Sequence, residues 1–230
     1  MPRTARASAG GICYHVINRG NGRATVFHGD GDYRAFLSLL GEAASKVAMP
    51  VLGYCLMPNH FHLLLWPNED GDLSRFMQWL MTAHVRRYHS FRGSSGHVWQ
   101  GRYKAFPIQQ DGHLLTVLRY VERNPLRAWL VRRAEAWRWS SLSARSGNVE
   151  RPSFLRDIPQ PLPVNWIDLV NEQEPADEVE RIRVSVNRGA PFGEDRWCRR
   201  TAMRLGTESS LRPRGRPPTQ KGGHSTFQEK

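Results

Sequence analysis

Two apolar runs of strand length stand next to each other in the sequence. The first is VLGYCLM (51–57), the second is HFHLLLW (60–66), and only Pro58 and Asn59 separate them. Apolar runs of this length are typical of strands, and Pro-Asn is a turn dipeptide. The pair therefore predicts two adjacent strands, so the chain must fold around a sheet.

Strands and helices alternate over the rest of the first half of the chain. The predicted elements are a strand (12–18), a helix (30–48), a helix (about 71–90), a strand (97–109) and a helix (112–123). Asn124-Pro125 interrupts the last helix, because the residue before a proline avoids helical angles. Pro125 can then open a second short helix. The alternation predicts a compact α/β or α+β sandwich over roughly 12–132.

The composition changes after Trp139, where the regular apolar spacing of the first part of the chain is lost. A proline-rich stretch (147–165) resembles a linker, and the acidic stretch NEQEPADEVE precedes two predicted short helices that end at Gly206. The last residues offer almost nothing to bury, so we expect them to be disordered. The predicted division is a main domain (1–145), a linker with a helical C-terminal extension (146–206) and a disordered basic tail (207–230).

The charge balance points to a polyanionic partner. Lys and Arg number 33 against 21 Asp and Glu, which gives a formal net charge of +12 and a sequence pI near 10.4. A field of this sign concentrates nucleic acid, although a coding bias could account for the preference for Arg over Lys. No apolar run reaches the length of a membrane span. The three cysteines show no metal-ligand spacing. These features predict a cytoplasmic, nucleoid-associated protein with no membrane partner.

His60 and His62 carry the first chemical signal. Side chains at i and i+2 of a strand point to the same face, so both imidazoles lie opposite Phe61, Leu63 and Leu65. Two histidines at this spacing suit a divalent metal and leave coordination positions open for phosphate chemistry. The alternative is a pair of histidines on an edge strand with no ligand, and the motif alone does not decide between them.

Tyr120 and Asn124 give the second signal. They are four residues apart on the helix predicted at 112–123, a spacing that places both on one helical face. A tyrosine oxygen can attack phosphorus and form a covalent phosphotyrosine, and the carboxamide of Asn124 could complete the metal site. Alternatively, Tyr120 is a core aromatic and Asn124 caps the short helix that Pro125 opens.

Three ordered motifs resemble one known family. YCLMPNHFHLLLWP (54–67), HVWQGRYK (97–104) and YVERNPLRAWLV (120–131) are similar to tyrosine transposases of the IS200/IS605 type, and more narrowly to the REP-associated tyrosine transposases. The hallmark of that family is the HUH motif, which His60, Phe61 and His62 match. Tyr120 matches the nucleophile in the family pattern Tyr-x-x-x-Asn-Pro-x-Arg-Ala. The resemblance extends over about 12–143.

The resemblance implies a fold and an activity. The fold is α+β: a ferredoxin-like antiparallel sheet with packed helices, the HUH endonuclease fold. The activity is cleavage of single-stranded DNA that folds into hairpins, through a 5′-phosphotyrosine at Tyr120, with Mg²⁺ or Mn²⁺ held by His60, His62 and Asn124. A relaxase or replication initiator, and a DNA-hairpin-binding regulator without cleavage, are the alternatives. The REP-associated branch favours a monomer over a homodimer.

Basic residues in three places are candidates for DNA contact. One set flanks Tyr120 and another interleaves with Trp99, Tyr103 and Phe106. These aromatics could stack bases, and the alternative is that they belong to the core, as alternate aromatics on a strand more often do. The third lies in the basic tail, as in an arm that enters a DNA groove. The candidates are Arg119, Arg123 and Arg127; Arg102 and Lys104; and Arg212, Arg214 and Arg216. The other histidines, His15 among them, show no metal-ligand spacing and receive no role.

Overall fold

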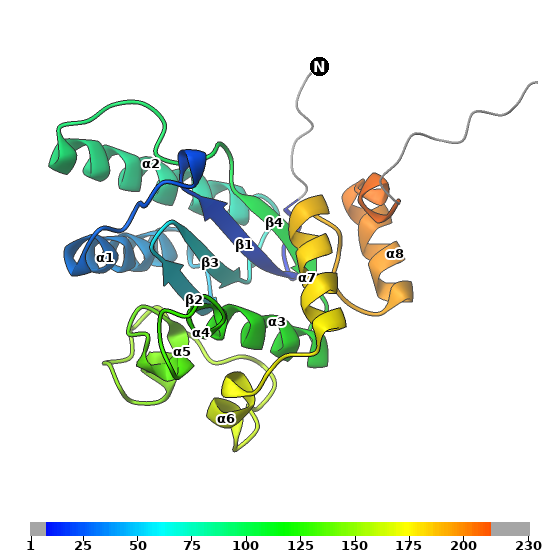
Figure 1. The fold of residues 1–230 in the computed structure, drawn as a ribbon. Coiled ribbons are helices and arrows are strands. Elements are labelled where there is room, and N and C mark those ends of the chain that lie inside the picture. The colour runs from blue at the N-terminus through cyan, green and yellow to red at the C-terminus, as the bar shows by residue number, and fades with distance from the viewer. Residues whose placement is uncertain (1–7, 213–230) are drawn as a thin grey trace, which may run out of the picture.

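A four-stranded antiparallel sheet is the centre of the fold (Figure 1). The computed structural model describes residues 8–212, and its strands lie in the order β2-β3-β1-β4. Their bounds are β1 Cys13–Arg19, β2 Val51–Met57, β3 His60–Leu65 and β4 Lys104–Ile108. Every neighbouring pair is antiparallel. The two apolar runs around Pro58-Asn59 thus form the predicted adjacent strands.

Helices cover both faces of the sheet. The helices α1 (Asp30–Val47) and α2 (Asp72–Arg92) pack on each other and on one face, while α3 (Gly112–Glu122) packs on the other, close to β2. Gly53 permits this approach, because a Cβ at that position would lie 2.6 Å from Leu118 Cδ1. The arrangement confirms the predicted α+β fold with a ferredoxin-like antiparallel sheet.

Each face of the sheet has its own hydrophobic core. Phe61, Leu63 and Leu65 belong to the core beneath α1 and α2, whereas Leu64 belongs to the core beneath α3. This division confirms the alternation predicted for the HFHLLL run. Because strand side chains alternate, His60 and His62 are on the α3 side of the sheet.

The segment 97–109 differs from its prediction. Only Lys104–Ile108 is a strand, and the residues before it form an irregular segment along α2. Trp99 packs against Phe61 in one core and Phe106 is buried in the other, so neither ring is placed to stack on bases. Gly96 and Gly101 have positive φ, which breaks strand geometry and explains the shortening.

Four α-helices follow in the described chain, the first before the predicted boundary at residue 145 and the other three in the C-terminal extension. They are α5 (Ser141–Arg145), α6 (Trp166–Asn171), α7 (Ala176–Arg188) and α8 (Asp195–Leu205). The acidic stretch joins α6 to α7 and contributes to both, so it does not precede the helices as predicted. Side chains of the extension complete the core beneath α3, among them Trp166, Val170, Ile182 and Phe192. The division at residue 145 stays a prediction. No helix within residues 8–212 has the length and apolar character of a membrane span.

Candidate active site

A cavity of about 550 Å³ opens at one end of the sheet, where β1 ends and β3 and β4 begin. We call it the site cavity. Residues from β1, β3, the 100–104 segment, the junction of α3 with α4 (Asn124–Arg127) and α7 line it: Ile17, Asn18, Arg19, His60, His62, Gln100, Arg102, Lys104, Tyr120, Asn124, Arg127, Arg183, Val186 and Asn187. Distant parts of the sequence, including the predicted metal and nucleophile residues, therefore meet in one place.

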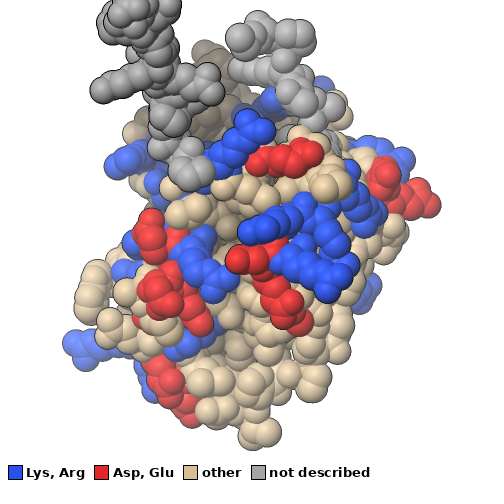
Figure 2. All heavy atoms as spheres, turned by 90° about the vertical axis from the view of Figure 1, so that its right-hand side faces the viewer, with Lys and Arg blue, Asp and Glu red and all other residues tan. Residues whose placement is uncertain are grey.

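The charge in the site cavity is of one sign. Its described lining residues include four arginines and one lysine, and neither Asp nor Glu is among them. On the face that carries α7 and α8, by contrast, Lys and Arg side chains lie among Asp and Glu side chains (Figure 2). A cavity lined by one sign of charge focuses the field, so this cavity favours a phosphate ligand.

His60 is the first residue of β3, directly after the turn. Asn59 Oδ1 lies 2.7 Å from His60 Nδ1, so Nδ1 carries the proton and donates it to the carboxamide oxygen. Burial, assisted by the nearby Arg19, lowers the pKa of His60 to about 4. The imidazole is therefore neutral near pH 7, and its Nε2 has a lone pair available for a cation.

His62 lies deeper and is bonded at both ring nitrogens. The carboxamide Nδ2 of Asn124 donates to His62 Nε2 at 2.6 Å, and His62 Nδ1 lies 2.7 Å from His15 Nε2. Burial lowers the pKa of His62 well below its ordinary value, and the neighbouring His15 and His60 lower it further. Burial likewise lowers the pKa of His15 to about 3. This row of imidazoles is uncharged at neutral pH.

Tyr120 lies in the last turn of α3, facing the histidines. Its ring centroid is 5.9 Å from that of His62, and the Arg127 guanidinium stands 4.2 Å from the ring. The residue is 8% exposed, so the cavity is its route to solvent. Within residues 8–212 its hydroxyl forms no hydrogen bond. The phenol oxygen is thus available to a ligand in the cavity.

The carboxylate of Glu122 holds the end of α3 in place from the opposite side. It is fully buried and accepts hydrogen bonds from Ser141, from Arg145 Nε at 3.1 Å and from Trp166 Nε1 at 2.8 Å. A buried carboxylate with this many donors is rigid, because losing any of them would leave polar groups unpaired. Side chains of α5 and, from the extension, Trp166 therefore fix the helix turn that carries Tyr120.

Asn124 follows the break between α3 and α4 (Asn124–Arg127). It is the first residue of α4 and its side chain makes no capping bond, so the capping interpretation of the sequence is wrong. Its carboxamide instead meets His62. The proline that follows explains this placement, because it ends α3 and turns the chain toward the sheet.

The donor set fits a divalent cation. Within residues 8–212 no group of three or more His, Cys, Asp and Glu side chains could hold one, so the candidate set is two imidazoles and a carboxamide. The imidazoles of His60 and His62 are neutral, as ligation requires, and the Asn124 side chain can turn its oxygen toward the same point. The set leaves coordination positions open, which phosphate chemistry needs.

The predicted DNA-contacting residues separate into two groups. Arg102, Lys104 and Arg127 line the site cavity. Arg119 and Arg123 instead donate to backbone carbonyls at the end of α6 and just beyond it. Glu174 forms ion pairs with Arg123 at 3.4 Å and with Arg127 at 2.5 Å. These partners attach the extension to the helix that carries Tyr120.

The basic tail falls mostly outside the described residues. Arg212 is described and borders a different cavity, between α7 and α8, while Arg214 and Arg216 lie outside residues 8–212. Arg212 is therefore not part of the site cavity.

Sequence reasoning missed four residues of this region. His15 and Arg19 point to the same face of β1 as Ile17, which pairs with His62, and Arg19 pairs with His60. Alternation along the predicted strand 12–18 could have found them. Arg183 and Asn187 reach the cavity from α7. No local pattern indicated these two, because only the packing of α7 against β4 brings them there.

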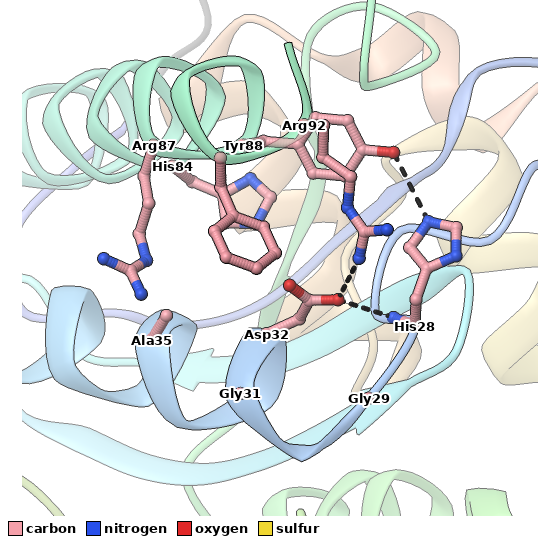
Figure 3. A pocket seen from close by; sticks show the side chains of 10 residues that line it. His28, Gly29, Gly31, Asp32, Ala35, His84, Arg87, Tyr88 and Arg92 are labelled. Carbon is pink, nitrogen blue, oxygen red and sulfur yellow. Dashed lines mark hydrogen bonds and ion pairs between the residues drawn. The ribbon is translucent and has the colours of Figure 1, made fainter. Parts of the chain in front are cut away.

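A second cavity of about 350 Å³ lies between α1 and α2, on the other face of the sheet (Figure 3). We call it the α1–α2 cavity. Asp32 is at its centre and accepts from the backbone N–H of His28 at 2.8 Å and from Arg92 at 2.7 Å. Tyr88 and the buried His84 also line it. This cavity thus has its own carboxylate, which neutralises Arg92.

Comparison with known proteins places the chain among transposases. The family described as "Transposase IS200 like" matches residues 8–124. A solved structure of a REP-associated tyrosine transposase bound to a REP hairpin is similar with a TM-score of 0.53 and 17% identity, over 71% of this chain and 93% of the other. A candidate transposase from Deinococcus radiodurans R1 has a TM-score of 0.38 and 21% identity, over 52% and 95% of the two chains. No curated protein matches.

Proposed function

The chain belongs to the IS200-like transposase family, and from this premise we propose that it is a metal-dependent single-stranded DNA endonuclease and strand transferase. Its nucleophile is Tyr120 and its substrate is DNA that folds into a hairpin. One observation carries the proposal: Tyr120, His60, His62 and Asn124 converge in a cavity with basic walls. The fold shared with a transposase that binds a REP hairpin supports a palindromic substrate.

The proposed step exchanges one phosphoester for another. The Tyr120 oxygen attacks the scissile phosphorus, the bond from phosphorus to the 3′ oxygen breaks, and the released 3′ oxygen takes up a proton in place of the one lost by the phenol. The 5′ end of the downstream strand is left on Tyr120. Because the phosphotyrosine keeps the energy of the broken bond, a 3′ hydroxyl can reverse the step or join a new strand.

The histidines and the carboxamide support this chemistry by holding a divalent cation, Mg²⁺ or Mn²⁺. When bound, such a cation neutralises charge on the non-bridging phosphate oxygens. His60 and His62 offer neutral nitrogens, and burial keeps them unprotonated at the pH at which the enzyme works. The carboxamide of Asn124 provides an oxygen ligand from the α3–α4 junction.

The DNA backbone is held by the basic walls. Arg102 approaches from the segment before β4 and Lys104 from the first position of β4. Arg127, paired with Glu174, stands over the Tyr120 ring. Arg19 adds a further cation, and its Nε is buried without a hydrogen-bond partner within residues 8–212. Phosphate oxygens would satisfy these donors and position the scissile bond next to Tyr120. We expect a monomer to suffice, acting where chromosomal DNA lies in the cytoplasm.

The deciding experiment compares wild type with Tyr120→Phe on denaturing gels. The substrates are 5′- and 3′-labelled single-stranded hairpins from DNA that flanks the gene, with Mg²⁺ or Mn²⁺. We expect a covalent protein–DNA adduct with wild type and none with Tyr120→Phe, while native gels show the same hairpin affinity. Tyr88→Phe, which removes a phenol from the α1–α2 cavity, is the matched control and should form the adduct.

The other outcomes separate the alternatives. Full-rate cleavage by Tyr120→Phe would refute the assignment of the nucleophile. Tight hairpin binding without cleavage under all metals would favour a regulatory hairpin binder. Cleavage of a unique origin-like site, with indifference to palindromes, would favour a relaxase or replication initiator.

A further inference from the structure

His15 lies directly behind His62, out of contact with solvent. It is on β1, where its neighbour Ile17 pairs with His62 across the sheet. The ring is fully buried and stacks on the His62 ring with centroids 5.0 Å apart. Its Nε2 is 2.7 Å from His62 Nδ1. His15 Nε2 is thus the hydrogen-bond partner of the His62 nitrogen that faces away from the site cavity.

The bonds around His62 determine where its proton lies. A neutral imidazole has one donor and one acceptor nitrogen. Asn124 Nδ2 donates to His62 Nε2, so the proton of His62 is on Nδ1 and is donated to His15 Nε2. A cation at Nε2 requires the same order, because the ligating nitrogen must offer its lone pair.

The acceptor role leaves His15 with an unsatisfied donor. With Nε2 accepting, the proton of His15 is on Nδ1, and within residues 8–212 this buried atom has no hydrogen-bond partner. A buried donor without a partner costs stability, so its presence calls for a compensating role. Accepting a hydrogen bond from His62 at Nε2 is such a role, and it explains why the unpartnered Nδ1 is tolerated.

We propose that His15 is a positioning residue that accepts the Nδ1 proton of His62, and so fixes the ring and the tautomer in which Nε2 is offered to the divalent cation. The inference rests on the proposed function, because it assumes a cation at His62. Metal-binding histidines generally need such a partner for the second ring nitrogen, most often a carboxylate or a carbonyl. Here another imidazole supplies it, from the neighbouring strand.

The test measures Mn²⁺ binding to the DNA-free protein by isothermal titration calorimetry. His15→Phe keeps an aromatic ring but removes the acceptor, and we expect Mn²⁺ affinity to fall by about 10- to 100-fold. His15→Gln brings an amide oxygen within reach of His62 Nδ1 and should recover most of the affinity. Hairpin affinity in the presence of a chelator should be unchanged in both variants.

A matched control is available on the other face of the sheet. His84 is also a buried histidine whose Nδ1 has no hydrogen-bond partner within residues 8–212, but it lies among aromatic rings of the core beneath α1 and α2. His84→Phe should bind Mn²⁺ as wild type does. An equal loss in His84→Phe and His15→Phe would mean general loosening of the fold, and would overturn the inference.

Two results distinguish the failure of this inference from that of the proposed function. Unchanged Mn²⁺ affinity in His15→Phe, with a large loss in His62→Ala, would overturn the role of His15 alone. Unchanged affinity in His62→Ala would overturn the proposed metal site and this inference with it. If His15→Phe does not fold, His15→Asn replaces it, because the shorter amide cannot reach His62; equal Mn²⁺ binding by the Asn and Gln variants would then overturn the role.

Discussion

The two cavities on opposite faces of the sheet contain similar residue types in different arrangements. Each has histidines, a tyrosine and arginines, and Figure 3 shows those of the α1–α2 cavity. In the α1–α2 cavity Asp32 pairs with Arg92, and the buried His84 has an unpartnered nitrogen within residues 8–212. In the site cavity no described lining residue is acidic, and His62 is bonded at both nitrogens. Composition alone would not distinguish the two.

This difference in acidic lining residues indicates which cavity can bind a phosphate. A carboxylate within an arginine's reach already satisfies that arginine, and it repels a phosphate. In the site cavity Arg127 pairs with Glu174 and Arg183 with Glu180, and neither carboxylate lines the cavity. Arg19, Arg102 and Lys104 form no ion pair within residues 8–212. The field inside the site cavity is therefore positive, which favours a phosphate, and its histidines are uncharged near pH 7, as ligation of a cation requires.

Removing a site histidine should have the largest effect. We expect His62→Ala to reduce the rate of metal-dependent hairpin cleavage by about 100-fold or more, because it deletes a ligand and leaves Asn124 and His15 without their shared partner. His84→Ala should change the rate little once its lower stability is allowed for. Single-turnover cleavage at saturating protein measures both, and equal rate reductions would remove the distinction between the cavities.

The pH dependence of stability should expose the structural role of His84. Burial lowers its pKa from 6.5 to about 4, opposed by the nearby Asp32. Between these values the unfolded chain binds more protons than the folded one, so stability falls as pH falls from about 6.5 to about 4, and levels off below. In His84→Phe this decrease should be smaller by about 2–3 kcal/mol.

Urea unfolding at pH 7 and pH 4.5 would measure the effect in both proteins. An identical pH dependence in wild type and His84→Phe would show that the folded protein protonates His84 as readily as the unfolded chain does, and that burial does not lower its pKa. The His84 side chain would then be solvated as well as a side chain on the protein surface.

Neutralising cavity cations should weaken DNA binding by a smaller amount. For the double variant Arg102→Gln, Lys104→Gln we expect hairpin affinity to fall about tenfold. The salt dependence of log K should also become shallower by about 0.7 for each phosphate of the single strand that the variant no longer neutralises. Arg87→Gln, in the α1–α2 cavity, should change neither quantity. Fluorescence anisotropy over a salt series measures them, and equal slopes for both variants would count against a DNA path through the site cavity.

Asp32→Asn should have the smallest effect. It removes the ion pair with Arg92 and weakens the bond to the His28 amide, at a cost of about 1 kcal/mol or less, because both partners are partly exposed. Hairpin affinity should stay within about twofold of wild type. A clear gain in affinity would mean that the freed Arg92 binds DNA, and that both cavities serve the substrate.

Local patterns predicted the sheet and the centre of the site for identifiable reasons. Strand periodicity placed His60 and His62 on one face, and the Asn-Pro break set Asn124 just beyond the helix that carries Tyr120. The same reasoning failed where contacts override periodicity. The segment before Lys104 is irregular although a strand was predicted there, and Arg119 and Arg123 are held by the extension although they were predicted to contact DNA.

Spacing along the chain is enough to predict the order of strands and helices, the faces of the HFHLLL strand and the motifs that contain His60, His62 and Tyr120. Only the tertiary structure decided which cations border the site cavity, that His15 lies behind His62, and that α7 closes one wall. These interactions join residues that are far apart along the chain. Their geometry follows from side-chain packing across the sheet, and no local period in the sequence encodes it.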